Sequence, residues 1–346
     1  MTDAAESDRL ADTRHPRETS VFLGHAEAER TLIESYASGR MPHGWIIGGP
    51  EGVGKATLAY RMARFALANP VPEDTRGRAD LAVPPNHPVA RQVASQSHVD
   101  LVVLKRVLNH ERKTFFSDIR AEDVRRVVSF FGSTAGSGGW RVAIVDVADD
   151  LNAAGANALL KILEEPPPRC LFLILAHQPG RMLPTLRSRC RRLILGSLST
   201  EDAAAAARLA RPDLDGPLLA RAAKLGRGSV RRTITLASGE GLDLHEALAG
   251  ILEGLPRLDK AAAHSLAERC TGKGGDDAFA LILSFLEDWL HDRVHAERDA
   301  APARLARWAE VWEKAAGSAR DVEVFNLDRR PFVLSTLSML ARASQG

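Results

Sequence analysis

The residues from Gly49 to Lys55 have the types and spacing of a phosphate-binding loop. They read Gly-Pro-Glu-Gly-Val-Gly-Lys, with glycines at Gly49, Gly52 and Gly54. Glycines let successive backbone N–H groups close around phosphate oxygens, and the lysine adds a positive charge. An apolar run precedes the loop and a helical pattern follows it, as in a P-loop. The loop therefore predicts a nucleotide site for ATP or ADP, and a glycine-rich helix entry without a ligand remains the alternative.

The position after the lysine departs from this chemistry. A P-loop places Ser or Thr there to hold Mg²⁺, and this chain has Ala56. Thr57 does not simply replace that hydroxyl, because one helical step turns a side chain by about 100°. We therefore expect weak or absent Mg²⁺ binding, with Thr57 as a further candidate contact to the nucleotide.

A second motif ends in Asp146. Four apolar residues, Val142 to Val145, precede this acid. The pattern predicts a buried parallel strand that presents a carboxylate at its end, as in a Walker B motif. The next residue is Val147, where active ATPases of this kind place a glutamate, and Asp149 and Asp150 stand in the wrong register. Both departures affect hydrolysis rather than phosphate binding, and a buried structural carboxylate remains the alternative for Asp146.

Strands and helices alternate through the first part of the chain. The apolar runs predict strands over Trp45–Ile47, Leu101–Leu104, Arg141–Asp146, Cys170–Leu175 and Arg192–Leu195. The helical patterns cover Ala26–Ala37, Lys55–Ala68, Ala121–Phe131, Ala153–Leu163 and Met182–Arg187. This alternation predicts an α/β fold, with a parallel sheet that is covered on both faces.

Strand patterns end after Ser197, and only helical ones follow. We expect four regions: a disordered polar tail over residues 1–20, an α/β P-loop domain over 21–197, a small helical lid over 198–241 and an all-α collar over 242–346. Within the last region, Phe279–Val294 carries an apolar stripe at helical spacing. Its members are Ile282, Phe285, Leu286, Trp289 and Leu290.

Composition excludes several classes of protein. The chain has 346 residues and a net charge of +2. Only 5% of its residues are aromatic, which disfavours an aromatic platform for single-stranded nucleic acid. Its three cysteines, Cys170, Cys190 and Cys270, lie far apart, so we expect no metal site and no zinc. There is no signal peptide and no apolar run of membrane-spanning length, which favours a cytoplasmic location without a membrane partner.

Three further stretches carry a resemblance. Asn157 to Pro167 reads Asn-Ala-Leu-Leu-Lys-Ile-Leu-Glu-Glu-Pro-Pro, residues 188–190 read Ser-Arg-Cys, and Gly39 to Gly44 precedes the P-loop strand. In their order along the chain, 39–44, 157–167 and 188–190, they resemble the clamp-loader branch of the AAA+ ATPases, which serves bacterial DNA polymerase III. The resemblance covers about residues 20–240. Relatives often carry a cysteine zinc module after the P-loop helix, and residues 69–97 lack those cysteines.

The resemblance implies a role in DNA replication. Clamp loaders are hetero-oligomeric rings of five subunits that open a sliding clamp and place it on primer–template DNA. The implied partners are a gamma/tau-type ATPase, a delta-type subunit, the clamp and, through the complex, DNA. Arg189 would be the arginine finger that this chain donates to its neighbour's ATP, and Arg231 would reach a nucleotide from the lid. A solvent-exposed arginine is the alternative at both positions.

The resemblance and the two departures together indicate a subunit with weak or absent ATPase activity of its own. The alternative is a catalytically active AAA+ ATPase, either gamma/tau-like or an independent motor, in which Thr57 and either Asp149 or Asp150 restore the chemistry. A P-loop small-molecule kinase fits the Ser-Arg-Cys motif and the helical C-terminal third poorly.

Overall fold

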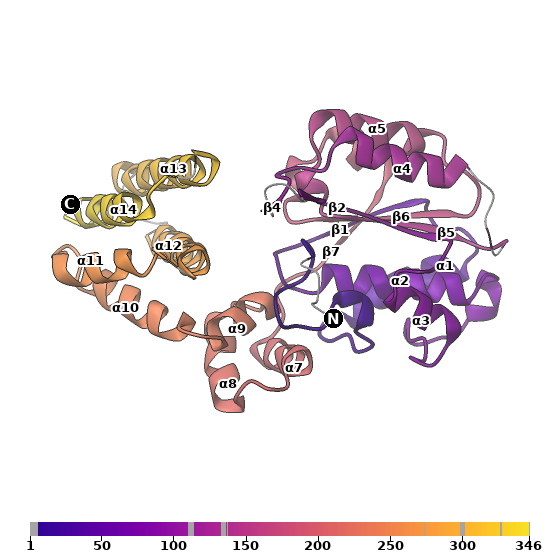
Figure 1. Ribbon diagram of the computed structural model, residues 1–346, viewed down its shortest axis with the longest axis horizontal. Coiled ribbons are helices and arrows are strands. Elements are labelled where there is room, and N and C mark those ends of the chain that lie inside the picture. Colours follow the sequence, from indigo (N-terminus) through magenta and orange to yellow (C-terminus); the bar gives the residue numbers. More distant parts are fainter. Residues whose placement is uncertain are drawn as a thin grey trace. The chain divides into compact units, whose positions relative to one another are not determined.

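The chain forms two compact units, Met1–Ile234 and Thr235–Gly346. The computed structural model describes residues 6–109, 114–132, 136, 138–272, 274–297, 302–325 and 327–345. The first unit holds the sheet and most of the expected lid, and the second is helical (Figure 1). Each unit is described by itself.

A sheet of five parallel strands forms the centre of the first unit, in the order β2-β5-β6-β1-β7. Its strands are β1 (Gly44–Gly48), β2 (Leu101–Lys105), β5 (Arg141–Asp146), β6 (Cys170–Ala176) and β7 (Arg191–Ile194). All five predicted strands are thus confirmed to within about a residue at each end. A separate antiparallel pair, which the sequence did not predict, joins β3 (Leu108–Asn109) and β4 (Thr114–Phe115).

Helices cover both faces of the sheet (Figure 1). One face carries α1 (Ala26–Ala37), α2 (Lys55–Ala68) and α3 (Pro88–Ala94), and the other carries α4 (Ala121–Gly132) and α5 (Ala153–Glu164). Strand β1 shows how its sequence serves both faces, because alternate side chains point to opposite sides. Trp45 and Ile47 belong to the core beside α1 and α2, whereas Ile46 belongs to the core beside α4 and α5.

The expectation of a disordered tail is wrong for residues 6–20. A short 3-10 helix, η1 (Pro16–Glu18), packs on α2, and His15 is fully buried with its ring edge-on to Tyr60 at 5.6 Å. The Arg64 guanidinium of α2 donates to the carbonyl oxygens of Arg17 and Thr19, at 2.5 and 2.6 Å. A segment held through its backbone carbonyls needs no apolar pattern, so its composition resembles that of a free tail.

Residues 69–97 pack on the same side of the unit. They form a 3-10 turn, η2 (Pro72–Thr75), and α3, whose first turn is capped by the His87 side chain. The segment is joined to the core through Leu81, which is 1% exposed and donates its backbone N–H to the buried Glu29 carboxylate at 3.0 Å. Apolar contacts and this hydrogen bond therefore stabilise residues 69–97, which contain no cysteine.

Three helices follow the sheet: α7 (Thr200–Ala210), α8 (Gly216–Leu225) and α9 (Val230–Ala237). Ser199 and Asp215 cap the first two by accepting backbone N–H groups of the opening turn, which explains where those helices begin. The boundary between the two compact units falls within α9, seven residues before the predicted boundary at residue 241.

The second unit contains five helices in the part that the structure describes. They are α10 (Gly241–Glu253), α11 (Lys260–Glu268), α12 (Gly275–Ala296), α13 (Pro302–Phe325) and α14 (Arg329–Ala343). The predicted stripe on α12 is buried at Ile282, Phe285, Leu286 and Leu290, and Trp289 stacks edge-on against Trp308 at 5.6 Å. Among the described residues, no helix is long and apolar enough to cross a membrane.

Candidate nucleotide site and the arginine of the Ser-Arg-Cys motif

The predicted P-loop joins the carboxyl end of β1 to the first turn of α2. All three of its predicted glycines have positive φ: +142° at Gly49, +77° at Gly52 and +105° at Gly54. These are backbone conformations that residues with a Cβ rarely adopt. A Cβ on Gly49 would also collide with the carbonyl oxygen of Leu195, just after β7. The loop thus has its glycines where the backbone requires them.

Lys55 is folded back into the loop. Its ammonium donates to the carbonyl oxygens of Gly49 and Pro50, both at 2.7 Å, and lies 2.8 Å from Nδ1 of His177. The residue is only 5% exposed, and this burial lowers the pKa of Lys55 to about 8. Burial and the nearby lysine also lower the pKa of His177, which favours a neutral ring whose Nδ1 accepts from the ammonium.

Asp146 ends β5 at the same edge of the sheet. Burial disfavours its charged form, and with the nearby Asp8 carboxylate it raises the pKa of Asp146 to about 7; Lys55 and Lys105 act in the opposite sense. Lys105 is its direct neighbour across the β2–β5 pairing. The carboxylate therefore faces lysines from two different elements.

The two acids that follow are engaged elsewhere. The Asp149 carboxylate accepts the backbone N–H groups of His177 and Gln178, at 2.6 and 2.9 Å. The Asp150 carboxylate lies 3.1 Å from the Arg106 guanidinium. Asp149 thus fixes the turn after β6 that brings His177 to Lys55, a role that its position in the sequence did not reveal.

The lid packs directly against the P-loop. Val230, the first residue of α9, donates its backbone N–H to the carbonyl oxygen of Gly52 at 2.9 Å. A Cβ on Gly52 would meet Cβ of Arg231 at 2.7 Å, so the contact requires glycine. The Arg231 guanidinium lies 3.2 Å from the Glu51 carboxylate, which holds it beside the loop.

A cavity of ≈ 510 Å³ brings most of the predicted site residues together. Its walls include Gly52, Gly54, Lys55, Thr57, Asp146 and Arg231. A volume of this size suits a small-molecule ligand. Residues of the N-terminal segment 7–23 also line this cavity, which the sequence did not predict. Nothing in their types or spacing predicts this position.

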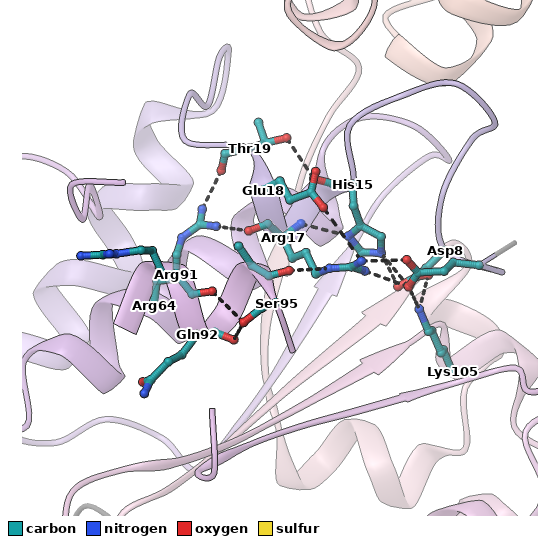
Figure 2. A network of polar contacts seen from close by, with 12 residues as sticks. Asp8, His15, Arg17, Glu18, Thr19, Arg64, Arg91, Gln92, Ser95 and Lys105 are labelled. Carbon is teal, nitrogen blue, oxygen red and sulfur yellow. Dashed lines mark hydrogen bonds and ion pairs between the residues drawn. The ribbon is translucent and has the colours of Figure 1, made fainter. Parts of the chain in front are cut away.

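Glu6 and Asp8 anchor the N-terminal segment beside this cavity. The Lys105 ammonium lies 2.5 Å from a Glu6 oxygen and 2.6 Å from an Asp8 oxygen, and Figure 2 shows it pointing at Asp8. Nε2 of His15 lies 3.0 Å from the other Asp8 oxygen, and Arg17 binds the Glu6 carboxylate through both arms at 2.8 Å. Each carboxylate thus has a cation of the protein itself as partner.

We expect acid to release this anchor. Burial opposes the charge of both carboxylates, but hydrogen bonds from Arg17 and Lys105 to Glu6, and from His15 and Lys105 to Asp8, lower each pKa to about 2. Because these values lie below the ordinary 4.5 and 3.8, the anchor stabilises the fold fully above about pH 4.5. That stabilisation is then lost as pH falls toward 2.

Replacing Lys105 by methionine is expected to weaken the anchor at neutral pH by about 1–3 kcal/mol, because two largely buried carboxylates lose a partner. Hydrogen–deuterium exchange of residues 6–20 measures the effect. Exposed Lys161→Met is the matched control. Equal protection in wild type and Lys105→Met would contradict the anchoring role.

Arg189 lies outside the cavity, at the end of the short helix α6 (Pro184–Arg189). Its guanidinium donates to the Thr185 carbonyl oxygen at 3.1 Å and lies 2.8 Å from the Glu164 carboxylate. The side chain is 35% exposed. The structure therefore places Arg189 outside the cavity that the P-loop lines.

Comparisons with known proteins point to one family. The model of the family described as "DNA polymerase III, delta subunit" matches residues 24–199. The chain is 32% identical to DNA polymerase III subunit delta′ of Pseudomonas aeruginosa over 256 residues, 72% of this chain and 70% of the relative. It is 33% identical to subunit delta′ of Yersinia pestis over 46% of this chain and 44% of the relative. It is also 27% identical to subunit tau of Escherichia coli over 79% of this chain and 41% of the relative. The chain therefore belongs to the family of DNA polymerase III delta′ subunits.

Proposed function

We propose that this chain acts in the clamp loader of DNA polymerase III as a subunit that donates Arg189 to its neighbour's ATP and hydrolyses little ATP itself. It helps to open the sliding clamp and to place it on primed DNA, together with a gamma/tau-type ATPase and a delta-type subunit. Membership of the delta′ family supports a place for this chain in the clamp loader. The weak hydrolysis and the donated arginine are argued from residues of this chain.

The proposal that this chain hydrolyses little ATP rests on one observation. The acids that follow β5 already bind other groups of the chain. Hydrolysis needs a polar side chain that orients the attacking water, and Val147 supplies none. Asp149 already accepts two backbone N–H groups, and Asp150 is paired with Arg106. With Ala56 at the metal position as well, the site retains phosphate-binding groups without the groups that activate water.

Arg189 supports the second part of the proposal, in which this chain acts on the ATP of a neighbouring subunit. A planar guanidinium offered by a second subunit neutralises charge that develops on a transferred phosphoryl group. Arg189 is partly exposed, lies outside its own nucleotide cavity and belongs to the Ser-Arg-Cys motif. It can therefore reach a neighbouring subunit without first leaving a site in its own chain.

The test is reconstitution. The purified chain is mixed with gamma/tau-type and delta-type subunits, and the mixture is examined for one complex that loads the clamp onto primed circular DNA. We expect loading only when the chain is present. Equal loading without it would overturn the assignment to the complex.

A gamma/tau-like ATPase is the second candidate. The match to subunit tau across 79% of this chain favours it, and so does Thr57, which lines the cavity beside Lys55. This candidate requires ATP turnover by the chain alone, whereas the delta′-type function does not.

Nucleotide binding to Lys55 is expected to take up protons. Its pKa is about 8 in the nucleotide-free site because the ammonium is buried, and a bound phosphate favours the charged form. At pH 8 about half a proton should be taken up per nucleotide bound, and less at pH 7. Calorimetry in two buffers that differ in ionisation enthalpy measures this number. Asp146→Asn should retain the uptake, and its disappearance there would assign the proton to Asp146 instead.

A further inference from the structure

Arg189 is held by a carboxylate of its own chain. Its Nη2 lies 2.8 Å from Oε1 of Glu164, the last residue of α5, and its Nη1 donates to the Thr185 carbonyl oxygen at 3.1 Å. An arginine carries five N–H donors in a fixed planar fork. Two contacts, one through each Nη atom, therefore orient the guanidinium, and the remaining N–H donors can bind a second ligand.

Buried neighbours align the two residues. Cys190 follows Arg189 and Leu163 precedes Glu164, and both are buried, at 9% and 1% exposure. A Cβ placed on Gly44 would lie 2.7 Å from Sγ of Cys190 and 3.5 Å from Leu163, so both side chains pack at the start of β1. The ends of α5 and α6 are thus fixed to the same point of the sheet.

We propose that Glu164 is a positioning residue for Arg189. It orders the guanidinium before the neighbouring subunit docks, so that less side-chain freedom is lost when the arginine meets the phosphate. This inference rests on the proposed trans-acting function of Arg189, and it gives a role to the first glutamate of the Glu-Glu-Pro-Pro run.

The pair is partly exposed, at 35% for Arg189 and 49% for Glu164, so its expected effect is modest. Exposed pairs of this kind correspond to about a two- to five-fold change in an equilibrium or rate. Because the arginine acts on the transition state, we expect the change in kcat of the one ATP site that receives Arg189, with KM for ATP at that site unaltered.

The experiment uses the assembled complex with clamp and primed DNA, and measures single-turnover ATP hydrolysis at the site that receives Arg189, so that kcat and turnover refer to that site. The variants are Glu164→Gln, Glu165→Gln, Arg189→Ala and the double variant Glu164→Gln/Arg189→Ala. Glu165 is the exposed next residue, so its replacement makes the same change in charge. We expect Glu164→Gln to lower kcat about two- to five-fold and Glu165→Gln to leave it unchanged. In the double variant, loss of Glu164 should add nothing to loss of Arg189, because the carboxylate acts only through the arginine.

Other outcomes separate the two claims. If Arg189→Ala leaves turnover unchanged, the trans-acting function fails and the role of Glu164 fails with it. If Arg189→Ala lowers turnover but Glu164→Gln does not, only the positioning role is wrong. A rise in turnover with Glu164→Gln also overturns it, because Glu164 would then restrain the arginine. An additive loss in the double variant would indicate a structural effect on the interface.

Discussion

Replacing Arg189 by alanine should slow hydrolysis about 10³- to 10⁵-fold at the neighbouring ATP site that receives it, the range associated with arginine fingers. The reason is electrostatic: charge develops on the equatorial oxygens of the γ-phosphoryl group in the transition state, and alanine offers no positive charge to stabilise it. The total rate of ATP hydrolysis by the ring should fall only by the fraction that this one site contributes. Single-turnover hydrolysis in the assembled complex measures the site itself.

The control for this prediction is Arg192→Ala. Arg192 is an exposed arginine on β7, three residues further along the chain, so its loss makes the same change in charge. The chain's own fold should survive Arg189→Ala, because only a partly exposed ion pair is removed. Equal hydrolysis by the two variants would show that general charge, and not a positioned arginine, matters at this interface.

Removal of Glu29 should give the largest loss of stability. One of its oxygens accepts from Nε and Nη2 of Arg61, at 3.0 and 2.6 Å, and from the backbone N–H of Leu81 at 3.0 Å. Glu29 and Arg61 are only 8% and 5% exposed. Glu29→Ala leaves a buried cation unpaired, which costs about 3–5 kcal/mol. The free energy of opening of α2, from hydrogen exchange, measures this loss.

Two further variants test the explanation. Glu29→Leu combined with Arg61→Met removes both charges, so it should be less destabilising than Glu29→Ala, with a residual cost of about 1–3 kcal/mol for the unpaired N–H of Leu81. Glu27→Ala removes the exposed pair with Arg30 on the same helix and should cost under about 1 kcal/mol. Similar losses for Glu27→Ala and Glu29→Ala would contradict the account.

The sequence predicts the centre of the sheet well because β1 and β6 are buried at every position and β5 at all but its last. Runs such as Cys170–Leu175 are apolar at every position, and only a strand covered on both faces needs that pattern. The P-loop glycines are equally readable, since each has a backbone angle that favours glycine. Both patterns lie within a few consecutive residues, so they can be recognised in a single sequence.

The contacts made by polar residues over long distances were not predictable. Glu6 and Asp8 meet Lys105 across nearly a hundred residues, and Asp149 reaches the backbone after β6. Such pairs leave no periodic pattern, because any exposed acid and base look alike in sequence. The sequence therefore predicts a free tail for the N-terminal segment, whereas residues of this segment line the candidate nucleotide cavity.

The most direct test of the central claim is steady-state ATP hydrolysis by the chain alone, comparing wild type with Lys55→Ala at equal concentration. The account predicts turnover at background for both proteins, because Ala56 and Val147 leave the site without its metal hydroxyl and its water-orienting carboxylate. Turnover by wild type that Lys55→Ala abolishes would contradict it, and would show that Thr57 or a nearby acid completes a working site in this subunit.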